Sequence, residues 1–301
     1  MKIIDAHMHL VEVIAGIGSQ GELHHTSDGK AIYATGNEFK MIPGYLGDSS
    51  VTAESLITLM EKHNVEKGVL LQGNYFGMQN LSTYEAIKKY PDKFVGAASY
   101  DIFYRNKNKI IKHLFDELGF KIIKMEISTG SGLMANHDVI SLLDKKMIEV
   151  FEMANERNLV FVIDIGRPGN CCYQVSELEQ IVKKYPNMKF VVCHLTAPQA
   201  NDKYILQYNL KHLNYPNVYF DLAALNRNTK EAENPEAKAV EFIKDAISIV
   251  GSDHLMFGSD VPSTLCHQDY QEIIDYILKS DIEKHDLDNI FYNTANSVYF
   301  N

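Results

Sequence analysis

The stretch Ile-Ile-Asp-Ala-His-Met-His-Leu at residues 3–10 sets the architecture expected of this chain. Residues 3–6 have the composition of a short strand, and the residues directly after them distinguish two common α/β architectures. A doubly wound open sheet normally carries a glycine-rich phosphate loop, G-x-G-x-x-G, after its first strand. His7-Met8-His9 stands at that point instead. The opening of the chain therefore favours a closed barrel over a nucleotide-binding sheet.

Short β-branched segments alternate with amphipathic helical patterns, such as 54–63 and 145–158, along the rest of the chain. The eight expected strands are residues 3–6, 68–72, 94–99, 121–125, 160–163, 190–193, 218–220 and 255–257. Eight strand–helix units predict an α/β fold of the (β/α)8 TIM-barrel class. No shift in composition divides the chain, so we expect one domain over residues 1–301.

Residues 11–52 interrupt this pattern. They include the glycine-rich and polar stretch GIGSQGELHHTSDGK and precede the first clear helical pattern. Connections of this length are uncommon in compact domains unless they have a function of their own. We therefore expect an insertion after the first strand that is long enough to act as a lid.

The composition excludes several classes of partner. The chain has 29 Lys and Arg against 39 Asp and Glu, so its formal net charge is −10, which opposes binding to nucleic acid and to anionic membranes. We find neither a signal peptide nor an 18-residue apolar run, and the 4 Cys lack zinc-knuckle spacing. We expect a cytoplasmic protein with free thiols whose partner is a small-molecule substrate. The oligomeric state is left open, a homo-oligomer included.

Four residues point to a metal site. His7 and His9 are two apart at the end of an extended strand, so both imidazoles point to one side. His194 follows the sixth expected strand and Asp260 the eighth, at the strand ends where barrels assemble their active sites. Strands one and eight are neighbours in a closed barrel, which would bring Asp260 to the two histidines. Two imidazoles and one carboxylate form an open three-ligand site suited to Zn²⁺.

The chain resembles the amidohydrolase superfamily of metal-dependent TIM-barrel hydrolases, and within it the branch of decarboxylases, hydratases and lactonases. The resemblance rests on residues 5–9, 192–194, 257–262 and 291–295, in the family's order. It implies that His7, His9 and Asp260 bind metal and that Asp260 also holds or deprotonates the attacking water. It implies for His194 the role of a further ligand or an acid–base group.

Two positions depart from the family pattern. Asp164 stands on strand five where relatives usually place a His ligand, and strand four offers Lys124 and Glu126 on one face. Either Glu126 or Asp164 could complete the site, which would then favour Zn²⁺ or Mn²⁺ with mixed ligands. Structural salt bridges to Lys124 or Arg167 are the alternative for both carboxylates. In the same way His194 could be a buried core histidine, and Asp260 could cap a turn.

Arginine is scarce and unevenly placed. Of the four in the chain, Arg105, Arg167 and Arg227 follow the third, fifth and seventh expected strands, on the loops of the catalytic face. Arginine grips a carboxylate with two parallel hydrogen bonds, so these residues suggest an anionic substrate. Solvated loop residues are the competing interpretation.

These observations predict a metal-dependent hydrolase that acts on a small carbonyl compound, an amide, ester or lactone bearing a carboxylate. Asp260 or His194 would transfer the proton, and His194 would stabilise the oxyanion. A metal-dependent lyase, decarboxylating or hydrating an unsaturated acid, would use the same residues. A barrel that binds a small ligand without turnover is the third hypothesis, favoured if Asp164 abolishes metal affinity.

Overall fold

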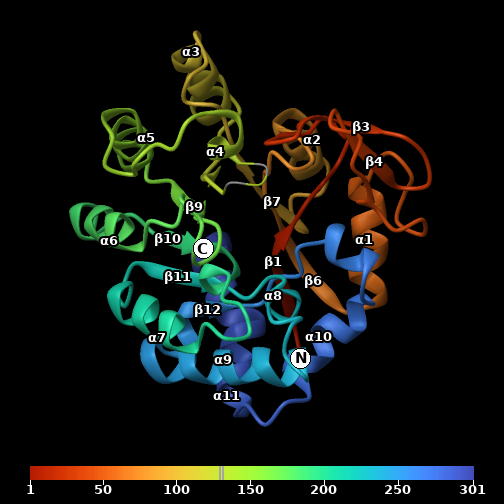
Figure 1. Cartoon of the computed structure of the whole chain (residues 1–301), viewed down its shortest axis with the longest axis vertical. Helices are drawn as coiled ribbons and strands as arrows, with labels where there is room; N and C mark the ends of the chain where they lie inside the picture. Colours follow the sequence, from red (N-terminus) through yellow and green to blue (C-terminus); the bar gives the residue numbers. More distant parts are fainter. Residues whose placement is uncertain (129, 131) are drawn as a thin grey trace.

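The computed structural model describes residues 1–128, 130 and 132–301, and its centre is a sheet of eight parallel strands in the order β1-β6-β7-β8-β9-β10-β11-β12. The strands are β1 Ile3–Met8, β6 Val65–Leu70, β7 Phe94–Ala98, β8 Ile122–Glu126, β9 Val160–Asp164, β10 Phe190–Val192, β11 Val218–Asp221 and β12 Leu255–Met256. Helices surround these strands (Figure 1). They are α1 Ala53–Lys62, α2 Asn80–Lys89, α3 Lys107–Ile111, α4 Leu133–Asn136, α5 Lys145–Glu156, α6 Val175–Lys184, α7 Lys203–His212, α8 Leu225–Asn228, α9 Pro235–Val250, α10 Tyr270–Leu278 and α11 Lys284–Asp288.

Backbone hydrogen bonds join the last strand to the first. The amide of Ala6 donates to the carbonyl of Phe257 at 2.9 Å, and the amide of Asp260 donates to the carbonyl of His7 at 2.8 Å. One step further along, the amide of His9 donates to the carbonyl of Val261 at 2.9 Å. The predicted (β/α)8 TIM barrel is therefore confirmed, and the two ends of the chain meet along one seam.

The local sequence explains where helices α2 and α6 end. Helices α2 and α6 both end in a pair of lysines, which complement the negative end of the helix dipole. Each is followed by a tyrosine and then by Pro91 or Pro186, which cannot continue a helix because it lacks an amide hydrogen. After these helix ends the chain continues into strands β7 and β10 of the sheet.

Apolar side chains fill the barrel below its carboxyl ends. A buried cluster inside it includes Ile4, Val69, Ile122, Val191 and Met256. A second, larger cluster lies between the strands and the surrounding helices. Packed layers of this kind make the barrel interior solid, so a cavity can form only at its mouth. None of the described helices is both long and apolar enough to cross a bilayer.

The segment between β1 and α1 forms a small sheet of its own. Four antiparallel strands make it, β2 Ile17–Gly18, β3 Gly21–His25, β4 Lys30–Tyr33 and β5 Glu38–Lys40. Val11 and Val51 exchange backbone hydrogen bonds of 3.0 and 2.7 Å where the segment leaves and rejoins the barrel. The insertion expected at residues 11–52 thus has a closed base and an internal hydrogen-bonded structure, neither of which the polar composition of the segment predicts.

Candidate active site

A cavity of about 240 Å³ lies at the carboxyl ends of the barrel strands. The described residues that line it are His7, His9, Gly73, Tyr75, Phe76, Lys124, Glu126, Asp164, His194, Arg227, Asp260 and Ser263. They come from both ends of the chain, and every barrel strand except β7 contributes to them directly or through the loop after it. The structure therefore brings together the predicted ligands and catalytic residues, and one of the three arginines.

His7, His9 and Asp260 lie close together because the barrel closes between β1 and β12. Oδ1 of Asp260 is 3.1 Å from Nε2 of His9 and 3.7 Å from Nε2 of His7. Ligand atoms about 2 Å from a tetrahedral metal ion are about 3.3 Å apart, so these separations match what an ion would require. Asp260 remains partly open to the cavity, whereas both histidines are buried.

Two of the site residues have unusual backbones. His194 has φ 58° and begins a run of four left-handed residues, separated from the end of β10 by Cys193. Asp260 has φ 60°. Non-glycine residues pay a steric cost in this region, and such conformations concentrate at functional sites. The left-handed turn changes the direction of the chain after β10, and the His194 side chain then lines the cavity.

Each of the three imidazoles donates its Nδ1–H to an acceptor behind it. Nδ1 of His9 lies 3.0 Å from the carbonyl oxygen of Leu71, and Nδ1 of His194 lies 2.9 Å from that of Ala223. A carbonyl can only accept, so the proton is on Nδ1 in both. Nδ1 of His7 donates to Oδ2 of Asp221 at 3.0 Å. When these rings are neutral, the lone pair of each is therefore on Nε2.

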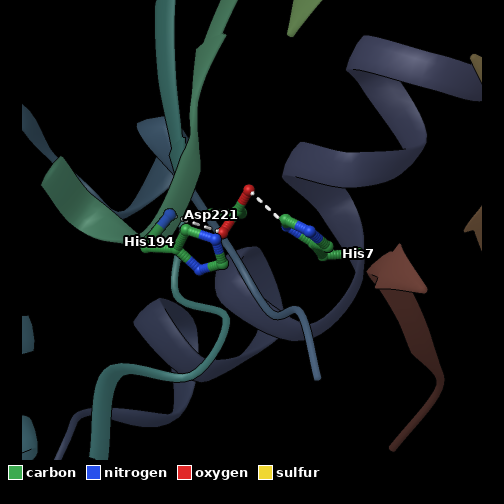
Figure 2. A group of neighbouring side chains, drawn as sticks. All are labelled: His7, His194 and Asp221. Carbon is green, nitrogen blue, oxygen red and sulfur yellow. Dashed lines mark hydrogen bonds and ion pairs between the residues drawn. The ribbon is translucent and has the colours of Figure 1, made fainter. Parts of the chain in front are cut away.

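Asp221 lies between two of these histidines (Figure 2). While Oδ2 accepts from the His7 ring, Oδ1 accepts from the backbone amides of His194 at 2.8 Å and Ala223 at 3.1 Å. Carboxylate–histidine pairs of this kind fix the tautomer and orientation of a metal ligand. Asp221 was not among the residues predicted from the sequence. Its signal was present, since it ends the seventh strand as a carboxylate in an otherwise apolar segment.

The Nε2 atoms fit a cation. Nε2 of His7 is buried and has no hydrogen-bond partner among the described residues. Nε2 of His9 presents its lone pair to a carboxylate oxygen of Asp260, a contact that needs a proton or a cation between the two atoms. Within the described chain two groups have ligand atoms close enough for a metal, namely His7, His9 and Asp260, and His7, His194 and Asp221. In the second group Asp221 already accepts Nδ1–H of His7 and the backbone amide of His194, so the first group is the better ligand set.

The electrostatics of the site agree with these roles. Burial lowers the pKa of His7 to about 4, against the opposing effect of Asp221, so the ring is neutral. Burial works to raise the pKa of Asp221, but the electrostatic interaction and hydrogen bond with the His7 ring, and the interaction with His194, lower it to about 2. Burial likewise works to raise the pKa of Asp260, yet its contact with the His9 ring and the nearby rings of His7 and His194 hold that pKa below its usual value. For His194 burial works to lower the pKa, while Asp164, Asp221 and Asp260 together raise it.

Glu126 and Asp164 are neighbours on adjacent strands, since they pair in the β8–β9 register. Each strand runs one residue further than predicted and ends on its carboxylate. Glu126 accepts the amide of Asn74 at 2.9 Å, and Asp164 lies 3.8 Å from Nε2 of His194. Both line the cavity, but neither joins a metal-ligand group within the described residues.

The three arginines are placed differently. Arg227 is half-buried and lines the cavity. Arg105 and Arg167 are exposed and are not among the described residues of its lining. Arg227 is therefore the one of the three in a position to meet a ligand that occupies the cavity.

The chain is similar to known proteins in sequence pattern and in fold. The sequence model of the amidohydrolase family matches residues 4–300. No curated protein sequence matches the chain significantly. Among solved structures, a probable 2-pyrone-4,6-dicarboxylic acid hydrolase of Acinetobacter baumannii with bound citric acid has 18% identity and a TM-score of 0.73 over 100% of both chains.

Two further structures are similar. An amidohydrolase of Burkholderia multivorans with bound zinc has 14% identity and a TM-score of 0.74, over 100% of this chain and 99% of that one. The 5-carboxyvanillate decarboxylase of Sphingomonas paucimobilis has 12% identity and a TM-score of 0.61, over 85% and 84% of the two chains. At these identities the likeness is one of fold. The match of the family model over nearly the full length shows that this chain belongs to the amidohydrolase family.

Proposed function

We propose that this chain is a metal-dependent hydrolase that acts on a small amide, ester or lactone carrying a carboxylate. The observation that carries the proposal is the common orientation of three imidazoles. Each gives its Nδ1–H to an acceptor behind it and leaves its Nε2 on the cavity side. Neutral imidazoles arranged in this way serve as metal ligands or as acceptors of a proton.

His7, His9 and Asp260 would hold the ion, with Glu126 or Asp164 as an additional oxygen ligand. Imidazole and carboxylate ligands suit Zn²⁺, and Mn²⁺ is the alternative if both carboxylates take part. A divalent ion in such a site lowers the pKa of a coordinated water and polarises a carbonyl group.

The remaining side chains divide the other tasks. Asp260 is ionised and partly open to the cavity, so it can accept a proton there. His194 has its pKa raised by three carboxylates, so a protonated ring can donate a hydrogen bond from Nε2 to an oxygen on which negative charge develops. Arg227, in the lining of the same cavity, would bind the substrate carboxylate.

The proposed setting is the reducing cytoplasm. The four cysteines, Cys171, Cys172, Cys193 and Cys266, are all free in the described structure, although two of them are adjacent in the sequence. A small-molecule substrate is the partner that a cavity of this size supports.

Metal analysis followed by product analysis tests the proposal. Purified protein should contain close to one equivalent of Zn²⁺ or Mn²⁺ per chain, and a His7→Ala variant should contain far less. The loaded protein is then screened against esters, lactones, amides and unsaturated diacids in ¹⁸O-labelled water. Incorporation of one ¹⁸O together with cleavage of the ester, lactone or amide bond identifies hydrolysis, whereas addition of labelled water across a carbon–carbon double bond without cleavage identifies a hydratase. Release of CO₂ without uptake of water would assign a lyase instead, and a His7→Ala variant that holds metal like the parent would overturn the site.

A further inference from the structure

Lys124 is a buried cation in the wall of the cavity. It lies on β8 two residues before Glu126, so both side chains point into the barrel, while Ile123 and Met125 pack outward in the core around it. Lys124 is 3% exposed, and it lines the same cavity as His7, His9 and Asp260. Lysine is almost never this buried unless its charge is paired.

No direct partner for this charge is found among the described residues. The carboxylates of Glu126, Asp164 and Asp260 line the same cavity, and with Cys193 they all act on Lys124 electrostatically. Yet no carboxylate oxygen lies within the 4.0 Å of an ion pair, and Nζ donates no hydrogen bond within the described part of the chain. Nζ of this buried side chain is not among the fully buried polar atoms without a partner in the described residues, so it is open to the cavity, and its three donors call for acceptors that enter from outside.

The charges of the lining indicate which acceptor fits. The described lining contains the carboxylates of Glu126, Asp164 and Asp260 and the cations of Lys124 and Arg227. Together these groups leave one negative charge in excess, which a divalent ion converts into one positive charge, and protonation of His194 would add another. Lys124 contributes one unit of this positive charge, as Arg227 does. Because the Lys124 side chain is buried, its charge acts at the inner wall of the cavity, where it makes the loaded cavity more attractive to an anion.

We propose that Lys124 is an anion-binding residue that receives a negatively charged oxygen of the ligand at the inner wall of the cavity, beside the metal position. The inference rests on the proposed function, because it assumes that the site binds a divalent ion. Two sources share this chemistry, a carboxylate carried by the substrate and the carboxylate that hydrolysis produces. Benzoate is a simple carboxylate and benzamide is its neutral isostere. Together they test anion binding at Lys124 without knowledge of the substrate.

The experiment measures the affinity for Zn²⁺ and the preference for benzoate over benzamide, two quantities that the loss of Lys124 should not reduce together. Zn²⁺ binding is determined by competition with a chromogenic chelator, and benzoate and benzamide binding to the Zn²⁺-loaded protein by ligand-detected NMR. The wild type should prefer benzoate. Lys124→Met should lose on the order of tenfold in benzoate affinity, keep its benzamide affinity and bind Zn²⁺ at least as tightly, because a repelling charge has been removed.

Two variants serve as controls. Lys121→Met removes the same charge from an exposed position just before the same strand and should change neither affinity. Lys124→Arg keeps the charge and should retain a preference for benzoate. Once a substrate is identified, a rise in KM on Lys124→Met points to a substrate carboxylate, and weaker product inhibition alone points to the product carboxylate.

Each contrary result has a distinct meaning. A Zn²⁺-loaded wild type without a preference for benzoate, or a Lys124→Met variant that keeps the preference, would overturn this inference and leave the proposed function intact. Joint loss of Zn²⁺ and benzoate binding in Lys124→Met would overturn it as well, by marking Lys124 as structural. A wild type that does not bind Zn²⁺ or Mn²⁺ would overturn the proposed function and, with it, the inference.

Discussion

Nδ1 of His7 lies 3.0 Å from Oδ2 of Asp221, and both side chains are fully buried although 214 residues separate them in sequence. They stand on β1 and β11, with β12 between the two strands. The contact therefore reaches across the end of the barrel and aligns an imidazole of the first strand with a carboxylate of the seventh.

Replacing Asp221 with Asn should weaken metal binding by about 10- to 100-fold. The amide oxygen can still accept from the backbone of His194, but the amide nitrogen would face Nδ1 of His7 and donate to it. The proton of His7 would then move to Nε2, where it blocks the lone pair. Chelator competition measures the change, with thermal unfolding as the check on folding. Unchanged Zn²⁺ affinity would show that Asp221 does not set the tautomer of His7.

Removing the metal should destabilise the protein. A ligand held only by the folded state, at 100 times its Kd, contributes about 2.7 kcal/mol to the free energy of unfolding. Chelation should therefore lower the unfolding midpoint in urea for the wild type and leave that of His7→Ala unchanged. His137→Ala provides the matched control, since His137 pairs with Asp101 outside the cavity lining and should keep the wild-type response to chelation. Equal chelator sensitivity of wild type and His7→Ala would contradict this prediction.

The three arginines should differ in their effect on anion binding. Arg227→Met should reduce the affinity of the loaded protein for benzoate several-fold, because Arg227 lines the cavity. Arg105→Met and Arg167→Met remove the same charge from exposed loops and should have little effect. Ligand-detected NMR on the three variants makes the comparison. A comparable loss in all three would indicate long-range attraction in place of a contact.

The inserted sheet should influence ligand binding more than metal binding. A row of aromatic rings leads from it to the site: Phe39 lies 5.7 Å from Tyr75, Tyr75 lies 5.3 Å from Phe76, and Phe76 lies 5.5 Å from His9, measured between ring centroids. Phe39→Ala should loosen Tyr75 at the cavity wall and lower benzoate affinity, with Zn²⁺ affinity unchanged. Phe103→Ala, an exposed aromatic elsewhere, is the control. If Phe39→Ala leaves benzoate binding unaltered, the insertion does not act as a lid.

Much of the architecture follows from local sequence, because strand and helix patterns are set by side-chain periodicity and by stop signals such as Pro91 and Pro186. Alternation along a strand also places Glu126 and Asp164 correctly. Both share a face with the inward residues Ile122 and Val162 of their own strands. A pattern of period two carries this information in the sequence itself.

The place of His7 and His194 at the ends of expected strands identified them as site residues. The alternation of side chains along a strand does not explain how they are oriented. Ile4 and Ala6 point into the barrel, so strict alternation would turn His7 outward with Ile3. An irregularity in the β1–β6 pairing between Asp5 and Met8 reverses the facing and brings His7 to the cavity. Such an irregularity depends on the partner strand, which the sequence does not show.

The sequence alone predicts the eight strand–helix units and the polar residues at the strand ends. It also predicts the insertion at residues 11–52 that interrupts the pattern. Three features needed the folded molecule: the bond between Asp221 and His7, the position of Arg227 in the cavity lining, which Arg105 and Arg167 do not share, and the lack of a direct ion pair between Lys124 and any residue that the structure describes. The difference arises because strand periodicity is a local property of the chain. Hydrogen-bond partners, burial and charge balance come from contacts between segments up to about 250 residues apart, which exist only when the barrel is closed.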